Sequence, residues 1–109
     1  MASRLGLALF AASMVALSAA GAAALLSSDR EAELVTLLQH DCGSCHGLTM
    51  KGGLGPALRP ADLDGKSDEA LLEAILDGRP DTPMPPWRGL LTEEEARWMI
   101  ARLKEGLPQ

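Results

Sequence analysis

The sequence has no tyrosine and few aromatic residues of any kind, which make up 3% of the chain. The only phenylalanine, Phe10, lies in an apolar stretch near the N-terminus, so the rest of the chain has only Trp87 and Trp98. Small domains with so few large apolar side chains usually add a disulfide, a metal or a large cofactor to their core. The scarcity of aromatic residues therefore predicts such a stabilising element in this protein.

A concentrated positive charge is also lacking. The formal net charge is −5 over 109 residues, and the basic residues are scattered among carboxylates. Because nucleic-acid binding needs a positive surface patch, we expect no nucleic-acid partner. The length allows one ordinary domain, and no internal repeat and no sustained two-residue alternation are present. These absences argue against repeat and β-sheet architectures.

The N-terminal stretch differs in kind from the rest of the chain. Arg4 is followed by a long, uncharged run of apolar and small residues. A positive start, an apolar middle and a small-residue end are typical of a secretory signal peptide. We expect residues 1–24 to be the signal, cleaved after Ala22 or Ala24, with 25–109 as the folded domain in the periplasm. An uncleaved membrane anchor is the alternative, because about 20 apolar residues can span a bilayer.

Three later segments carry helix signals. They begin at Ser28, Ser67 and Thr92, hydroxyl residues that favour helix N-caps, and continue with apolar residues at helical spacing. Ser28 and Thr92 are each followed three residues later by a glutamate, which predicts a capping box at both helix starts. Gly78 follows the second segment at the position of a C-terminal cap. The stretch 42–65 is rich in glycine and proline, which predicts irregular structure. We therefore expect an all-α fold of three main helices, with long loops wrapped round a bound group.

The only two cysteines belong to the motif Cys42-Gly43-Ser44-Cys45-His46. Cys-x-x-Cys-His is the attachment signature of c-type haem. Two thiols at this spacing add to the two vinyl groups of the porphyrin, and the adjacent histidine then lies beneath the ring and ligates the iron. We therefore predict one covalently bound haem c, held by Cys42 and Cys45, with His46 as an iron ligand.

Other uses of the two cysteines fit the sequence less well. A disulfide between them would close a very small loop and stabilise the fold little. A thioredoxin-like site needs a βαβ context that is absent here. A zinc site needs further ligands, and His40 is the only other histidine. His40 precedes the motif by two residues and is expected to face solvent at a helix end.

A methionine is the expected second iron ligand, because histidine–methionine ligation is a standard c-type arrangement. Met84 lies far downstream of the motif, in a segment stiffened by three prolines, and is the preferred candidate. Met99 lies on the apolar face of the last helix and is expected in the core. Met50 follows His46 closely and remains a second candidate.

The motif at 42–46, Gly-Pro-Ala-Leu at 55–58 and the late Met84 before a C-terminal helix resemble class I cytochrome c. The resemblance extends from about Ser28 to the end of the chain. It implies that the carbonyl of Pro56 accepts a hydrogen bond from the histidine ligand and so fixes its ring. It also implies that the first and last helices cross and pack together.

Three longer stretches are similar to the NirC-type cytochromes of denitrifying bacteria, whose genes accompany the dissimilatory cytochrome cd-type nitrite reductase. They are Cys-His-Gly-Leu-Thr-Met-Lys-Gly-Gly-Leu-Gly-Pro-Ala-Leu (45–58), Ile-Leu-Asp-Gly-Arg-Pro (75–80) and Pro-Met-Pro-Pro-Trp-Arg (83–88). This similarity implies periplasmic redox partners. The protein would donate electrons to the nitrite reductase or act in the maturation of that enzyme's haem.

Taken together, the sequence predicts a monomeric electron carrier and not an enzyme, because an iron with both axial positions filled has no open site for a substrate. A haem enzyme or gas sensor is one alternative, and it requires that Met84 leave the sixth position open. A non-haem exported domain that uses Cys42 and Cys45 as a dithiol is another. Contact with the membrane is expected only if the N-terminal signal stays uncleaved.

Overall fold

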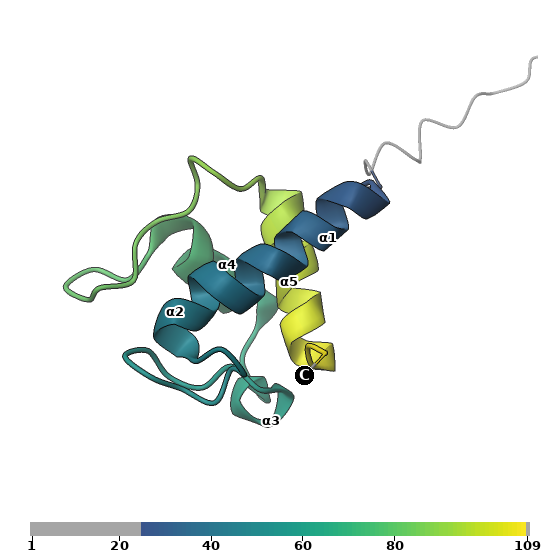
Figure 1. Ribbon diagram of the computed structural model, residues 1–109. Helices are drawn as coiled ribbons and strands as arrows, with labels where there is room; N and C mark the ends of the chain where they lie inside the picture. Colours follow the sequence, from purple (N-terminus) through teal and green to yellow (C-terminus); the bar gives the residue numbers. More distant parts are fainter. Residues whose placement is uncertain (1–24, 109) are drawn as a thin grey trace, which may run out of the picture.

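The computed structural model describes residues 25–108, so the expected signal at 1–24 and its cleavage sites lie outside the described residues. Within this range the chain is helical and contains no strand, which confirms the all-α prediction (Figure 1). The elements are α1 (Ser28–Leu37), the π-helical turn η1 (Leu38–Cys42), α2 (Gly43–His46), α3 (Pro60–Leu63), α4 (Asp68–Asp77) and α5 (Glu93–Glu105).

Helix α1 begins one residue away from the expected cap. The hydroxyl of Ser27 accepts a hydrogen bond of 3.1 Å from the backbone N–H of Arg30, so Ser27 is the N-cap and Ser28 is already helical. The predicted capping box from Ser28 to Glu31 was therefore wrong. Two adjacent serines have the same capping chemistry, and the sequence pattern does not distinguish which one keeps an extended backbone.

Helical structure continues through the cysteine motif. The π-helical turn η1 follows α1 directly and leads into α2, so the chain stays helical from Ser28 to His46 (Figure 1). The irregular stretch expected from residue 42 begins only at Gly47. The motif contains no proline, and its one glycine, Gly43, has an ordinary right-handed helical backbone. Single π-helical turns within α-helices occur frequently at functional sites.

A second helical turn interrupts the stretch expected to be irregular. Pro60 occupies the first position of α3, where its missing N–H costs nothing. The carboxylate of Asp62 accepts a 3.0 Å hydrogen bond from the backbone N–H of Arg59 and forms a 2.8 Å ion pair with that residue's guanidinium. Proline at this position was interpreted as a helix breaker, whereas in the structure it begins a helix.

The two remaining helices start where their caps predicted. The hydroxyl of Ser67 accepts a hydrogen bond of 3.2 Å from the Ala70 N–H at the start of α4. At the start of α5, the Thr92 hydroxyl accepts from the Glu95 N–H (3.1 Å) and the Glu95 carboxylate accepts from the Thr92 N–H (2.9 Å). This reciprocal pair is the predicted capping box. Gly78 directly follows α4.

The core forms where α1 crosses α5 and where α4 packs against α5 (Figure 1). Leu34 and Leu38 on the first helical run, and Met99 and Ile100 on α5, are at most 1% exposed. Each such side chain contributes about 1.5–3 kcal/mol by leaving water. The crossing that the cytochrome resemblance implied is therefore present.

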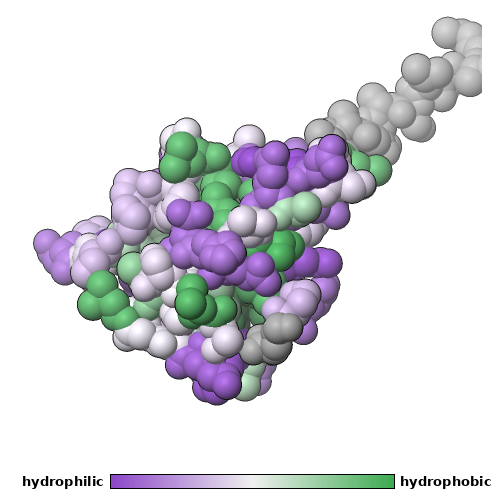
Figure 2. Space-filling model, viewed as in Figure 1, coloured by the Kyte–Doolittle hydropathy of each residue, from purple (hydrophilic) through white to green (hydrophobic). Residues whose placement is uncertain are grey.

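The surface mixes hydrophilic and hydrophobic residues, and the face in Figure 2 has separate apolar spots among polar ones. Leu48, Leu54 and Leu90 are each at least 70% exposed. Among residues 25–108, no helix is long and apolar enough to cross a membrane.

Candidate haem site

A cavity of about 820 Å³ lies between the cysteine-bearing helix, α4, α5 and the loops that follow α2 and α4. Its volume is in the range of protein pockets for organic ligands, about 300–1,000 Å³. Most of the lining is apolar, with leucine and isoleucine side chains from α4 and α5. The lining includes every residue that the sequence singled out for the site: Cys42, Cys45, His46, Pro56 and Met84.

His46 is the last residue of α2 and is 9% exposed. Its Nδ1 atom lies 2.7 Å from the carbonyl oxygen of Pro56. A carbonyl oxygen only accepts hydrogen bonds, so Nδ1 carries the proton and Nε2 keeps its lone pair. That tautomer leaves Nε2 available to ligate a metal ion.

The loop after α2 also restricts the His46 ring from the side. A methyl group added at Gly55 would lie 2.8 Å from ring atoms of His46, so the backbone of the loop contacts the imidazole directly. The Gly55 N–H donates a 2.8 Å hydrogen bond to the carbonyl of Cys45, which holds the loop against α2. Sequence reasoning missed this role of Gly55, although the residue directly precedes the proline that it did identify.

Both cysteines are half-buried, line the cavity and form no disulfide. They are three residues apart at the junction of η1 and α2, a spacing that places two side chains on the same side of a helix. Burial raises the pKa of the Cys42 thiol to about 11, with a smaller contribution from the neighbouring Asp41 carboxylate. Reactive dithiol sites instead have a lowered cysteine pKa, so this environment does not suit a thiol redox centre.

Met84 lies in the loop that follows α4 and is half-buried at the cavity. Its carbonyl accepts a hydrogen bond of 3.2 Å from the Arg79 N–H, and its own N–H donates to the Thr82 hydroxyl at 3.3 Å. Pro83, Pro85 and Pro86 surround it and have no N–H to donate. The loop is therefore stiff and carries a thioether at the cavity wall.

The other two methionines of the described chain are buried. Met99 on α5 is 1% exposed and belongs to the core, as expected, while also reaching the cavity. Met50 is 4% exposed, but it packs into the core cluster and does not line the cavity. This position weakens the case for Met50 as an iron ligand. His40 is exposed in η1, as predicted.

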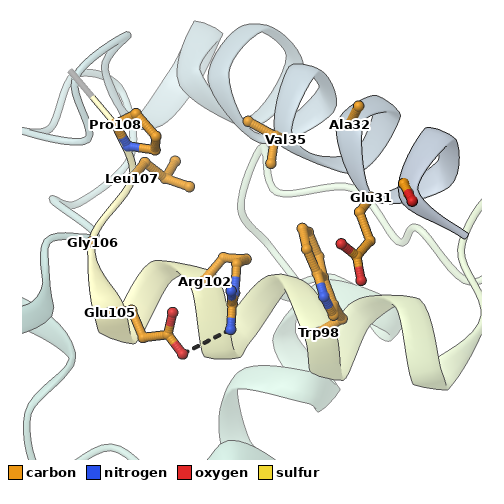
Figure 3. A pocket seen from close by; sticks show the side chains of 10 residues that line it. Glu31, Ala32, Val35, Trp98, Arg102, Glu105, Gly106, Leu107 and Pro108 are labelled. Carbon is orange, nitrogen blue, oxygen red and sulfur yellow. Dashed lines mark hydrogen bonds and ion pairs between the residues drawn. The ribbon is translucent and has the colours of Figure 1, made fainter. Parts of the chain in front are cut away.

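A second, shallower pocket of about 410 Å³ lies between α1, α5 and the chain after α5 (Figure 3). The Arg102 guanidinium lies 5.2 Å from the centre of the Trp98 ring and forms a 2.7 Å ion pair with Glu105. No residue of the cysteine motif lines this pocket. It is therefore separate from the candidate site.

The residues at the main cavity fit a covalently attached haem. They supply two thiols at vinyl spacing, an imidazole with its Nε2 free, a thioether and an apolar lining for the porphyrin. They do not fit a small metal ion. Within residues 25–108 no three histidine, cysteine, aspartate or glutamate side chains are grouped closely enough to hold one.

Comparisons with known proteins agree with this assignment. Residues 29–101 match the family described as cytochrome c oxidase, cbb3-type, subunit III. Cytochrome c55X of Pseudomonas aeruginosa is 60% identical over 77 residues, which are 71% of this chain and 65% of that protein. Cytochrome c55X of Stutzerimonas stutzeri is 48% identical over 107 residues, covering 98% of this chain and 92% of that protein.

Solved structures give the same result. The c-type cytochrome NirC superposes with a TM-score of 0.72 at 55% identity, over 73% of this chain and 94% of that one. Dihydro-heme d1 dehydrogenase NirN, solved in complex with DHE, gives a TM-score of 0.61 at 35% identity. That match covers 68% of this chain but 16% of the larger protein. The similarity therefore extends to one segment of a larger enzyme.

Proposed function

Because the chain belongs to the cytochrome c55X family of class I c-type cytochromes, which carry one covalent haem c, we propose that it is a carrier of single electrons. When bound, the haem supplies an iron that accepts and releases one electron. The proposal gives thioether attachment to Cys42 and Cys45, and axial ligation to His46 and Met84. The tautomer of His46 is the observation that best supports this proposal. Its Nδ1–H donates a hydrogen bond to the Pro56 carbonyl, so Nε2 remains free to ligate iron.

The protein's own residues then have three tasks. His46 donates from Nδ1 to Pro56, which fixes the ring plane and raises the basicity of Nε2. Met84 offers a neutral thioether, a ligand that raises the reduction potential. The apolar lining would contact the faces of the porphyrin with side chains from α4 and α5. Most of the cavity lining is apolar, which favours electron transfer over bond chemistry.

The proposed setting is the periplasm, which is supported by the signal pattern of residues 1–24. The proposed partners are the cytochrome cd-type nitrite reductase, as an electron acceptor, or the proteins that mature its haem. Similarity to NirC supports both roles. Similarity to a segment of dihydro-heme d1 dehydrogenase supports the second, because that protein's name places it in haem d1 chemistry.

The decisive experiment is an absorption spectrum of the protein matured in a host with c-type haem assembly, paired with Met84→Ala. We expect sharp reduced bands of a six-coordinate haem and a weak methionine–iron band in the oxidised protein. Met84→Ala should abolish that band, lower the potential and open the iron to added ligands. Met50→Leu is the matched control, because Met50 is buried away from the cavity.

Three results would contradict the proposal in different ways. Protein without covalent haem would favour the dithiol alternative. A high-spin wild-type spectrum would favour a haem enzyme or gas sensor with an open sixth position. Loss of the band in Met50→Leu but not in Met84→Ala would reassign the ligand.

The partner assignment needs a separate test. Reduced protein is mixed with purified cytochrome cd-type nitrite reductase, and its reoxidation is followed by stopped flow. Reoxidation that saturates with reductase concentration supports the donor role. Reoxidation no faster than that by air alone rejects the donor role and leaves haem maturation.

A further inference from the structure

The chain after Met84 closes the C-terminal end of α4. The last carbonyls of a helix have no partner within the helix itself. Here the Trp87 N–H donates to the Ile75 carbonyl and the Arg88 N–H donates to the Leu76 carbonyl, each at 3.0 Å. The loop that carries Met84 therefore leaves α4 and returns to the same helix end.

Gly78 is the point where this loop contacts the helix end most closely. Its φ angle is +69°, a conformation that favours glycine. A methyl group added there would lie 2.7 Å from the Met84 carbonyl oxygen and 2.9 Å from backbone atoms of Pro85 and Pro86. The backbone of residues 84–86 therefore rests directly on the α-carbon of Gly78.

A charged pair closes the loop beside this contact. The guanidinium of Arg88 forms two hydrogen bonds with the carboxylate of Asp77, at 2.8 and 2.9 Å. The Arg88 hydrogen bonds lower the pKa of Asp77. Both side chains are more than half exposed, so the pair contributes little by itself. The pair links Asp77, directly before Gly78, to Arg88, four residues after Met84.

We propose that Gly78 is a positioning residue for the sixth iron ligand, and that the Asp77–Arg88 pair assists it. The inference rests on the proposed ligation by Met84. Within the described residues, the backbone of Met84 forms hydrogen bonds with Arg79 and Thr82, which belong to the same loop. Because three prolines stiffen the segment, a displacement of residues 84–86 at Gly78 moves the thioether with them.

The chain offers a matched control for Gly78→Ala. Gly106 directly follows α5 as Gly78 follows α4, and it also has a positive φ outside the left-handed helical region (φ +97°, ψ +133°, against φ +69°, ψ −172° at Gly78). A methyl group added at Gly106, however, would meet only a side-chain atom of Pro60, at 3.5 Å. Gly106→Ala and Gly78→Ala therefore both place a side chain on a backbone that favours glycine, and only Gly78→Ala collides with the Met84 loop. A difference between the two variants measures the contact and not the backbone conformation.

The test measures the methionine–iron band and the affinity of the oxidised holoprotein for imidazole, which competes with Met84 for the iron. Forced overpacking of this size should make imidazole bind about tenfold more tightly to Gly78→Ala or better. Gly106→Ala should stay within about twofold of the wild type, because Gly106 does not line the cavity. Equal changes in both variants, or no change in Gly78→Ala, would overturn the proposal.

A second pair of variants keeps the test decisive if Gly78→Ala fails to accumulate. Asp77→Asn removes the charged pair, whereas Glu73→Gln makes the same charge change elsewhere on α4. Asp77→Asn should tighten imidazole binding by up to about fivefold, and Glu73→Gln should not. Equal effects would contradict the positioning role.

Met84→Ala distinguishes failure of the positioning role from failure of the proposed Met84 ligation. If Met84→Ala tightens imidazole binding and neither Gly78→Ala nor Asp77→Asn does, the positioning role alone fails. If Met84→Ala itself has no effect on imidazole binding, the proposed ligation fails with it.

Discussion

The helical side of the molecule, where α1 and α4 pack on α5, differs from the loop side, formed by residues 47–59 and 78–91. On the helical side, buried side chains such as Leu34, Leu72 and Ala96 pack on one another and do not line the cavity. On the loop side, many side chains line the cavity, together with those on the inner faces of α4 and α5. In the described chain no backbone hydrogen bond joins the two loops, and each loop bonds to itself or to an adjacent helix.

A magnitude shows why this difference matters. A cavity of about 820 Å³ leaves its apolar lining without packing partners from the chain, and each large apolar side chain contributes about 1.5–3 kcal/mol when it is buried. The whole stability of a small domain is about 5–15 kcal/mol. The chain therefore supplies the core of the helical side by itself and depends on its cofactor for the core of the loop side.

Removal of both attachment residues should have the largest effect, because it tests whether the loop side depends on the haem for its core. Cys42→Ser with Cys45→Ser should abolish covalent haem loading and leave the loop side without its core, so cooperative folding should be lost. Haem staining of a denaturing gel and thermal unfolding by circular dichroism measure the two effects. Ser44→Ala is the control, because this exposed residue lies within the same motif. A double serine variant that unfolds as cooperatively as the wild type would refute the account.

Truncation on the helical side should affect stability and spare the site. Leu34 is 0% exposed, so Leu34→Ala should lower the free energy of unfolding by about 2–5 kcal/mol. The haem spectrum of the folded protein should not change, because Leu34 does not line the cavity. Leu48→Ala makes the same chemical change at a residue 70% exposed and should cost about 0.5 kcal/mol or less. A spectral change in Leu34→Ala would show that the two sides are coupled.

The smallest expected effect concerns a buried charge on the helical side. Glu95 is 7% exposed, caps α5 and forms an ion pair with Arg30 at the start of α1. The Arg30 hydrogen bond, followed by that from the Thr92 N–H, lowers the pKa of Glu95. Glu95→Gln should therefore cost about 1–3 kcal/mol at neutral pH.

The pH dependence of that cost has a definite sign. Glu95 has a folded pKa below its unfolded value of about 4.3, so its contribution is fully present above that pH. It is lost as the pH falls through the lower folded pKa. The stability gap between wild type and Glu95→Gln, measured by urea unfolding, should narrow in acid. Glu94→Gln, at an exposed neighbour, serves as the control. A gap of constant size from neutral to acid pH would exclude the charge as its source.

Much of the fold was predictable, because its helix signals are local. Ser67 and Thr92 each cap a helix through a hydrogen bond to a residue three positions later, which the sequence shows directly. The choice between Ser27 and Ser28 was not predictable, since both have the same side chain. The helix at Pro60 was missed because proline both breaks helices and favours their first position.

The residues of the site also divide into those that the sequence could predict and those that it could not. The sequence named the residues with distinctive chemistry, and the structure brings Cys42, His46 and Met84 to one cavity. It did not identify Gly55 and Gly78, which matter because another part of the backbone lies too close for a side chain. Such contacts depend on the path of the chain in space and leave no local pattern. Glycines beside a predicted ligand segment are the signal that would have found them.

The π-helical turn at Leu38–Cys42 sets the rotational phase between the core and the site. His46 follows Leu34 by twelve residues, which in a regular α-helix is about three and a third turns, so the two side chains would point about a third of a revolution apart. A π-helical turn takes more residues per revolution and removes part of that offset. The same helical run therefore points the Leu34 side chain into the core and the His46 side chain into the cavity. The angle between these two directions is set by the backbone winding of five residues.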